Sequence, residues 1–148
     1  MARLHEQIET TLPIDEAFAF VADFANAARW DPGVASSERV GAGPVGPGAR
    51  YRLHVRMGGR VAPMEYAITT FSPPNRVVLI GKGSDVDAVD DIRFEATPTG
   101  TRIDYLAEIH LRGWMRLAAP FAGGAFARIA RDARDGMQRA LEQRAAAR

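Results

Sequence analysis

The stretch RYRLHVRMGGRVAPMEYAI, residues 50–68, consists of two runs that alternate between apolar and polar side chains on either side of a Gly-Gly pair. Alternation with period two is typical of strands with one buried face, and a Gly-Gly pair between such runs is typical of a two-residue hairpin turn. Pairing outward from the turn places Leu53 opposite Met64 and Tyr51 opposite Tyr66. The turn and the pattern select the same inward face, since a slip of one residue would reverse every side chain. The apolar face comprises Tyr51, Leu53, Val55, Met57, Met64, Tyr66 and Ile68.

Upstream of this hairpin, the sequence predicts a strand, two short helical segments and a second strand. Residues 3–12 alternate as a half-buried strand does, and residues 14–24 carry apolar side chains at helical spacing. A second helical turn follows over 26–32, where Pro32 stops it. Residues 34–40 form a weaker strand.

Downstream, the pattern predicts further strands joined by turns. Residues 76–83 are apolar on both faces, so their register stays open, and the acidic run 84–91 is predicted to be a turn. Strands over 92–96 and 102–111 flank the turn-forming residues 97–100.

The last part of the sequence predicts one long amphipathic helix over residues 114–144, because apolar side chains recur there every three or four residues. Pro120 and the Gly123–Gly124 pair could kink its start. An antiparallel sheet with one apolar face needs a cover, and this helix is the only element large enough. The sequence thus predicts an α+β fold in one domain, residues 1–148. About seven curved antiparallel strands wrap around the C-terminal helix, with two short helices after the first strand.

Composition excludes several classes of function. The 19 basic and 18 acidic residues give a net charge of +1 without a clustered basic face, so nucleic acid is not an expected partner. The absence of cysteine excludes disulfides, thiol catalysis and cysteine-ligated metals. We find neither a signal-peptide core nor an apolar run that would span a bilayer, so we expect a cytoplasmic protein with no integral membrane segment. Both a monomer and a homodimer remain open.

The stretch GAGPVG, residues 41–46, has the spacing of a dinucleotide-binding loop. Such a loop binds phosphate only when a helix follows it, because the amide groups at the helix N-terminus bind the pyrophosphate. Here Pro47 and a predicted strand follow instead. We therefore expect no nucleotide cofactor. We also expect no metal, because His5, His54 and His110 all fall on the polar faces of their strands.

Four segments resemble the polyketide cyclase/dehydrase and lipid transport branch of the START-like (SRPBCC) superfamily. They are LPIDEAFAFVADFANAARWDPGV (12–34), GAGPVGPGARYRL (41–53), TTFSPPNRVVLIGKG (69–83) and TGTRIDYLAEIHLRGWMRLAAP (99–120). The resemblance implies the helix-grip (START/Bet v 1-like) fold, with a cavity between sheet and helix. Members of the superfamily bind lipids, quinones or plant hormones, or cyclise and dehydrate polyketides. They share no catalytic motif, so the resemblance implies no catalytic residue.

Asp90 and Tyr105 are the candidate catalytic residues. Asp90 shares the parity of Ile92 and Phe94 and would lie near Ala107 across the 97–100 hairpin. A carboxyl group in an apolar cavity has a raised pKa and can act as an acid or base. The alternative is that Asp90 belongs to a solvated acidic loop, and that Tyr105 simply packs in the core.

The predicted ligand-binding residues are the inward-facing side chains together with the aromatic residues at the ends of the cavity. Tyrosine hydroxyl groups there would orient a ligand, or the rings would only pack. The set is Trp30, Tyr51, Leu53, Val55, Met64, Tyr66, Ile68, Ile92, Phe94, Ala107, Leu117 and Phe121.

Three functions follow as hypotheses. The first is binding of a small hydrophobic molecule, such as a lipid, polyketide or quinone-like compound. The second is a cyclase or dehydratase that uses Asp90 or Tyr105 to move a proton. The third is an accessory module that engages a partner protein or a quinone-containing complex through an apolar patch near Phe121 and Phe126.

Overall fold

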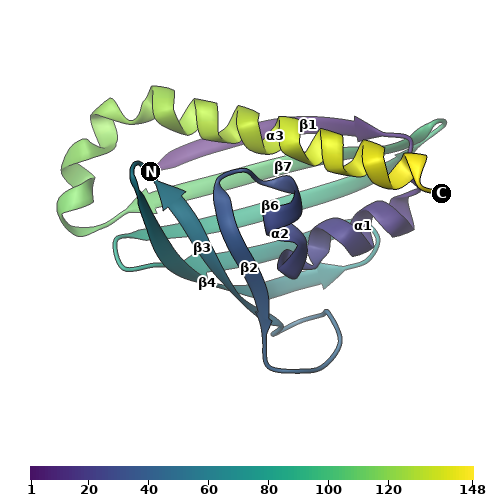
Figure 1. Cartoon of the computed structure of the whole chain (residues 1–148), viewed down its shortest axis with the longest axis horizontal. Helices are drawn as coiled ribbons and strands as arrows, with labels where there is room; N and C mark the ends of the chain where they lie inside the picture. Colours follow the sequence, from purple (N-terminus) through teal and green to yellow (C-terminus); the bar gives the residue numbers. More distant parts are fainter.

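The computed structural model describes residues 1–148 and contains a seven-stranded antiparallel sheet crossed by a long C-terminal helix (Figure 1). The strand order is β1-β7-β6-β5-β4-β3-β2. The predicted α+β architecture is confirmed. The elements are β1 (Ala2–Thr10), α1 (Ile14–Ala22), η1 (Phe24–Asn26), α2 (Ala27–Trp30), β2 (Val34–Val40), β3 (Arg50–Met57), β4 (Arg60–Ser72), β5 (Arg76–Lys82), β6 (Val86–Thr97), β7 (Gly100–Leu111), η2 (Gly113–Phe121) and α3 (Gly123–Ala146).

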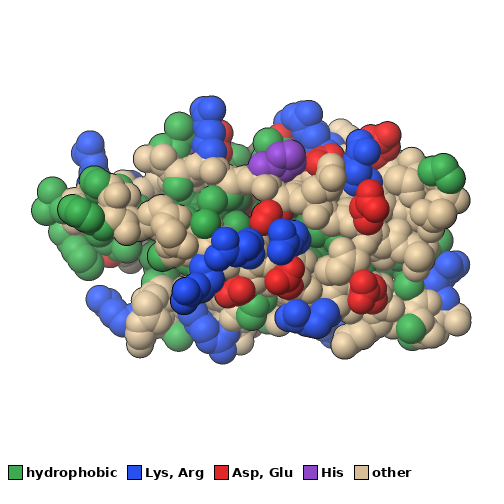
Figure 2. Space-filling view, turned by 90° about the horizontal axis from the view of Figure 1, so that it is seen from above, with side chains coloured by type: hydrophobic (Ala, Val, Ile, Leu, Met, Phe, Trp, Pro, Cys, Tyr) green, Lys and Arg blue, Asp and Glu red, His purple; other side chains and the backbone are tan.

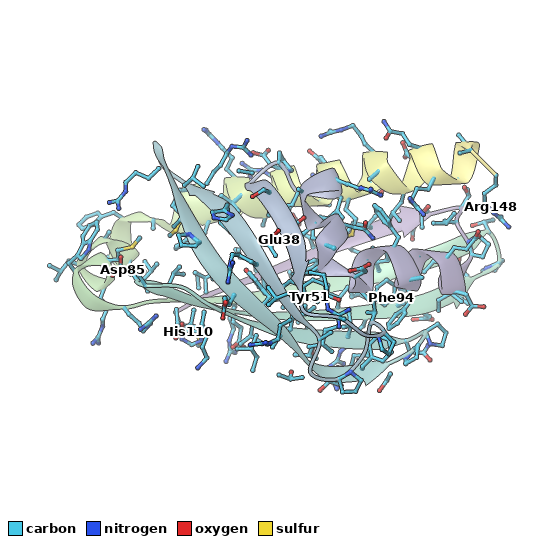
Figure 3. All side chains as sticks on the ribbon, turned by 60° about the horizontal axis from the view of Figure 1, so that its bottom comes forward. Glu38, Tyr51, Asp85, Phe94, His110 and Arg148 are labelled. Carbon is cyan, nitrogen blue, oxygen red and sulfur yellow. The ribbon has the colours of Figure 1, made fainter.

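The β3–β4 hairpin has the predicted register. Leu53 lies opposite Met64, and Tyr51 lies opposite Tyr66. The segment after the glycine-rich residues 41–46 is strand β3, so the helix that a phosphate-binding loop requires is not there. Figure 3 shows Tyr51 among the side chains enclosed between the sheet and the helices, and His110 at the outside of the sheet.

The prediction of an acidic turn over residues 84–91 is wrong, because strand β6 begins at Val86. Its inward residues Val86, Ala88 and Asp90 are buried. The outward acids are ion-paired: Asp87 contacts Arg112 at 3.2 Å, and Asp91 contacts Arg76 at 2.9 Å. The acidic residues that led to the prediction of a turn therefore belong to the outer face of a strand. In β5, whose register had stayed open, Val77 and Leu79 face inward and are fully buried.

The predicted helix over 114–144 is also wrong at its start. Residues Gly113–Phe121 form the 3₁₀ segment η2, and the α-helix α3 begins only at Gly123. Pro120 has no amide hydrogen to donate, and the Gly-Gly pair beyond it has low helix propensity. Trp114, Leu117 and Phe121 are 65%, 80% and 89% exposed. Figure 2 shows hydrophobic side chains gathered at this end of the molecule.

Helix α3 is held against the short helices by a close backbone contact. A Cβ atom at Gly136 would lie 2.0 Å from the backbone oxygen of Trp30, so only glycine allows this approach. Beyond it, Met137 and Leu141 are buried between α3 and the sheet. None of the helices is both long and apolar enough to cross a membrane.

Candidate functional site

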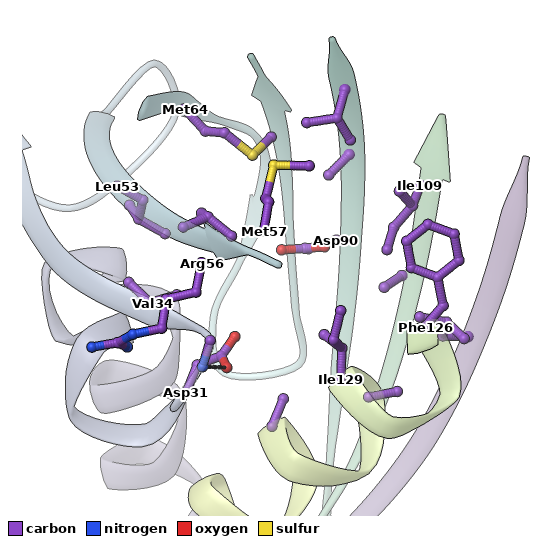
Figure 4. Close-up of a pocket in the computed structure, with 18 of the residues that line it drawn as sticks. Asp31, Val34, Leu53, Arg56, Met57, Met64, Asp90, Ile109, Phe126 and Ile129 are labelled. Atoms are coloured by element: carbon purple, nitrogen blue, oxygen red, sulfur yellow. Dashed lines mark hydrogen bonds between the residues drawn. The ribbon is translucent and has the colours of Figure 1, made fainter. Parts of the chain in front are cut away.

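A cavity of about 420 Å³ lies between the inner face of the sheet, the loop after α2, and the first half of α3 (Figure 4). Of its 33 lining residues, 26 are hydrophobic, so the walls favour an apolar occupant. The volume falls within the range of small-molecule sites in proteins, which is roughly 300–1,000 Å³. The helix contributes Phe126, Ile129, Ala133 and Met137 to the lining.

The structure brings eight of the predicted site residues to this cavity. They are Trp30, Leu53, Val55, Met64, Tyr66, Asp90, Tyr105 and Ala107. As predicted, Asp90 lies opposite Ala107 in the sheet register.

Four other predicted residues are buried but do not line the cavity: Tyr51, Ile68, Ile92 and Phe94. They lie where α1 and η1 cover the sheet. The ring of Phe94, for example, packs edge-on against Phe18 of α1 with centroids 5.1 Å apart. These short helices cover part of the inner face, so the inward parity of a strand residue does not by itself place it in the cavity.

Leu117 and Phe121 also lie outside the cavity, because η2 turns their side chains to the surface. The same segment presents Met115 and Ala118 to the cavity instead. Leu117 and Phe121 were predicted to face the cavity from a spacing of 3.6 residues per turn. A 3₁₀ segment has three residues per turn, so that spacing does not apply to it. Phe126, expected in an exposed patch, lines the cavity.

Asp90 is the central polar group of the cavity. Its side chain is almost fully buried, at 7% exposed, and Oδ2 accepts a hydrogen bond from the Tyr105 hydroxyl at 3.0 Å. Burial raises the pKa of Asp90 to about 7, the hydrogen bond from Tyr105 opposes this rise, and the charge of Asp31 adds to it. Burial and the Asp90 charge raise the pKa of Tyr105 well above its usual value, so Tyr105 remains a donor.

Asp31 is a second carboxyl group in the same cavity, and sequence reasoning missed it. It follows α2, and its Oδ1 accepts a hydrogen bond from the Gly33 amide at 2.8 Å. Burial raises the pKa of Asp31 to about 6, against the lowering effect of that hydrogen bond, and the charge of Asp132 on α3 raises it further. Its sequence context, Asp-Pro-Gly, is typical of an exposed turn and carries no sign of burial.

Tyr66 contributes a hydroxyl group that forms none of the side-chain hydrogen bonds of the chain, and the residue is only 8% exposed. Its ring lies over Gly81 of the adjacent strand, where a Cβ atom would come within 2.5 Å of ring carbons. Burial, together with the charges of Asp90 and Asp31, raises the pKa of Tyr66 well above its usual value.

Aromatic rings surround these polar groups. The ring centroids of Phe24 and Tyr66 are 5.4 Å apart, and those of Phe24 and Trp30 are 6.0 Å apart. Trp30 also packs edge-on against Tyr105 at 5.9 Å. Aromatic faces of this kind can bind a flat ligand or a cation.

The basic side chains that line the cavity are already occupied. Arg56 donates a hydrogen bond to the Pro32 carbonyl at 2.7 Å. Arg134 pairs with Glu6 at 3.5 Å and with Asp135 at 3.0 Å. Neither Asp31 nor Asp90 forms a salt bridge.

The histidines do not assemble into a site. His5 contacts Asp104 at 3.1 Å and His54 contacts Ser36 at 3.0 Å. The structure contains no group of three or more His, Asp or Glu side chains placed to hold a metal ion.

Solved structures share this fold. The chain superposes on an aromatase/cyclase from a Streptomyces species with a TM-score of 0.73 and 14% identity, covering 95% of this chain and 90% of that one. A START superfamily protein from Mycobacterium smegmatis gives a TM-score of 0.73 and 15% identity, covering 96% and 95%. At such identities the likeness shows the fold alone. No curated protein matches the chain.

The family assignment comes from comparing the sequence with a sequence model that describes a protein family. The model described as polyketide cyclase / dehydrase and lipid transport matches residues 1–142, which include every strand and nearly all of α3. The chain belongs to the polyketide cyclase/dehydrase and lipid transport family.

Proposed function

We propose that this protein binds a small, largely apolar molecule in the cavity and orients its polar group at Asp90. The observation that carries the proposal is the contrast within one cavity, whose walls are mostly hydrophobic while its few inward polar groups gather around the Asp90–Tyr105 pair. Burial of apolar ligand surface would supply affinity, and the polar groups would set orientation.

The comparisons support this proposal at the level of the family. Lipid transport is part of the family's description, and a START superfamily protein shares the fold. A lipid, a polyketide or a quinone-like compound would each place apolar surface against the walls and an oxygen or nitrogen atom near Asp90.

Fluorescence of N-phenyl-1-naphthylamine, which increases in apolar surroundings, tests the proposal. We expect saturable binding to one site. Ala107→Phe would fill the cavity and lower the affinity at least tenfold. Ala67→Phe, which adds the same ring on the opposite face of the sheet, is the control and should bind as the unmodified protein does. Equal binding by both variants would place the ligand elsewhere.

A second candidate function is acid–base catalysis of the cyclase or dehydratase kind. It is favoured by the burial of Asp90 and by a pKa near neutrality, which suits a group that accepts and returns a proton at pH 7. In this function Asp90 takes a proton from a carbon next to a substrate carbonyl, and Tyr105 positions the carboxyl group. Mass spectrometry of a bound polyketide-like compound distinguishes the two functions: a binding protein returns it unchanged, whereas an enzyme converts it and Asp90→Asn abolishes conversion.

A further inference from the structure

The ionisable groups of the cavity are unbalanced in charge. Three carboxyl groups line it, and only Glu6 has a basic partner, Arg134. Asp31 and Asp90 have none, because the nearby Arg56 donates to the Pro32 carbonyl group. Figure 4 shows Asp31 and Asp90 projecting into the cavity from two different walls. An ionised carboxyl group away from water is costly unless a cation compensates it. The chain itself provides no such cation.

Three oxygen atoms that line the cavity have no hydrogen-bond partner in the chain. Asp90 uses Oδ2 for Tyr105 and leaves Oδ1 free, and Asp31 uses Oδ1 for Gly33 and leaves Oδ2 free. The third is the hydroxyl oxygen of Tyr66, on a residue more than nine-tenths buried. All three groups line the same cavity, and the charges of both aspartates act on Tyr66. An ammonium group has three N–H donors and no acceptor.

The aromatic rings favour the same ligand group. Trp30, Tyr66 and Tyr105 line the cavity beside the two carboxyl groups, and Phe24 packs between Trp30 and Tyr66. The faces of such rings attract cations, most strongly when the site is shielded from water. Carboxylates combined with aromatic faces recognise an ammonium group better than a neutral oxygen atom.

We propose that the cavity takes a hydrophobic amine, with its ammonium group held by Asp31, Asp90 and Tyr66. This inference rests on the proposed function, since it names the class of ligand that the same cavity binds. The apolar body of the amine lies against the methionine, leucine and alanine side chains of the walls.

The way in which affinity changes with pH distinguishes an amine ligand from a neutral one. The groups that face Asp90 are Tyr105 on β7, Tyr66 on β4 and Asp31 after α2, while Asp132 on α3 acts on Asp31. An amine needs the carboxyl groups ionised, so its affinity rises with pH through 6 to 8. A ligand that accepts a hydrogen bond from protonated Asp90 loses affinity over the same range.

Three compounds that share one apolar body provide the test: 4-phenylbutylamine, 4-phenylbutan-1-ol and 4-phenylbutanoate. By isothermal titration calorimetry of the full chain at pH 8, we expect the amine to bind at least tenfold more tightly than the alcohol, and the carboxylate most weakly. Between pH 6 and pH 8 the affinity for the amine should rise severalfold and that for the alcohol should not.

Amide variants assign the effect to the two carboxyl groups. Asp90→Asn and Asp31→Asn keep an oxygen acceptor for Tyr105 and Gly33, so both should fold. Each should weaken amine binding about tenfold and change alcohol binding less than threefold. The control Asp87→Asn, on the outer face of β6, should leave both unchanged.

The outcomes distinguish the two proposals. If the alcohol binds as tightly as the amine, or if both amide variants bind the amine normally, the amine inference is overturned while binding in the cavity stands. If none of the three compounds binds, the cavity is not a binding site for molecules of this size and both proposals fall.

Discussion

Tyr105 donates its hydroxyl hydrogen to Oδ2 of Asp90 at 3.0 Å, joining adjacent strands at the wall of the cavity. The bond fixes one carboxyl oxygen and leaves the other facing the cavity. It also stabilises the ionised form of a group that burial drives toward protonation. Burial and the charge of Asp31 therefore favour protonation of Asp90, while the Tyr105 hydrogen bond opposes it and can be removed separately.

Removing the Tyr105 hydroxyl should raise the pKa of Asp90 above its value of about 7. In Tyr105→Phe the ring remains, while the hydrogen bond that stabilises the carboxylate is lost. Carbon-13 NMR of the carboxyl group across a pH titration measures this value. Tyr66→Phe, which removes a hydroxyl that does not bond to Asp90, is the control and should change the pKa less. An unchanged or lower pKa in Tyr105→Phe would contradict the role assigned to this bond.

The stability of the protein should fall with pH because of Asp90. Burial raises its folded-state pKa from 3.8 to about 7, so between these values the folded chain retains a proton that the unfolded chain loses. The stabilisation is fully present below about pH 4 and is lost as pH rises through 7. Asp90→Asn should thus raise the free energy of unfolding at pH 8 by up to about 4 kcal/mol, with a much smaller effect at pH 4.

The neighbouring Asp91 provides a control of opposite sign. Although partial burial raises its pKa, the hydrogen bonds and charges of Arg76 and Arg93 outweigh that effect and lower it below the usual value. Ionised Asp91 therefore stabilises the fold above pH 4, and Asp91→Asn should lower the free energy of unfolding at pH 8. Urea denaturation of both variants at pH 4 and pH 8 measures the difference. If both variants changed the free energy of unfolding in the same direction at pH 8, the buried environment assigned to Asp90 and the ion-paired environment assigned to Asp91 would be contradicted.

Gly136 should be intolerant of any side chain. In Gly136→Ala the new methyl group would meet the Trp30 carbonyl oxygen at 2.0 Å, so α3 must move away from α2. We expect a loss of about 3 kcal/mol in the free energy of unfolding. Gly124→Ala on the same helix meets no atom within 4 Å and should be neutral or stabilising by up to about 1 kcal/mol. Thermal or urea denaturation measures both, and equal effects would show that this close contact is not formed.

The apolar side chains of the first and second parts of the helix predicted over residues 114–144 should respond differently to the same substitution. Leu141 is fully buried, and Leu141→Ala should cost about 2–5 kcal/mol in the free energy of unfolding. Leu117 is 80% exposed, and Leu117→Ala should stay within about 0.5 kcal/mol. A large loss of stability in Leu117→Ala would mean that η2 packs as the continuous helix predicted from the sequence would.

Local patterns were sufficient to predict the β3–β4 hairpin, and they gave the inward position of Asp90 as one of two alternatives, the other being a solvated acidic loop. The register of β3 and β4 follows from the turn at Gly58 and Gly59, and the inward parity of Asp90 follows from counting back from Phe94. Both depend on period-two alternation, which reports directly which face of a strand is buried.

The rest of the site depends on tertiary contacts that no local pattern reports. Asp31 is partly buried beside the place where α3 approaches the end of α2, the contact of Gly136 with Trp30, which are about a hundred positions apart in the chain. The start of α3 was misplaced because Trp114, Leu117 and Phe121 repeat at helical spacing, although their segment is a 3₁₀ turn with those side chains outside.

The methionines allow a direct measurement of the central claim, which is that ligands occupy the cavity. Of the five methionines in the chain, four line the cavity, namely Met57, Met64, Met115 and Met137, while Met1 is 66% exposed and does not line it. We would label their methyl groups with carbon-13 and titrate the protein with 4-phenylbutylamine while recording methyl NMR spectra. The account predicts saturable shifts of the four cavity signals with Met1 unchanged. Shifts confined to Met1, or no shift of the four cavity methyl groups with any of the three phenylbutyl compounds, would contradict it.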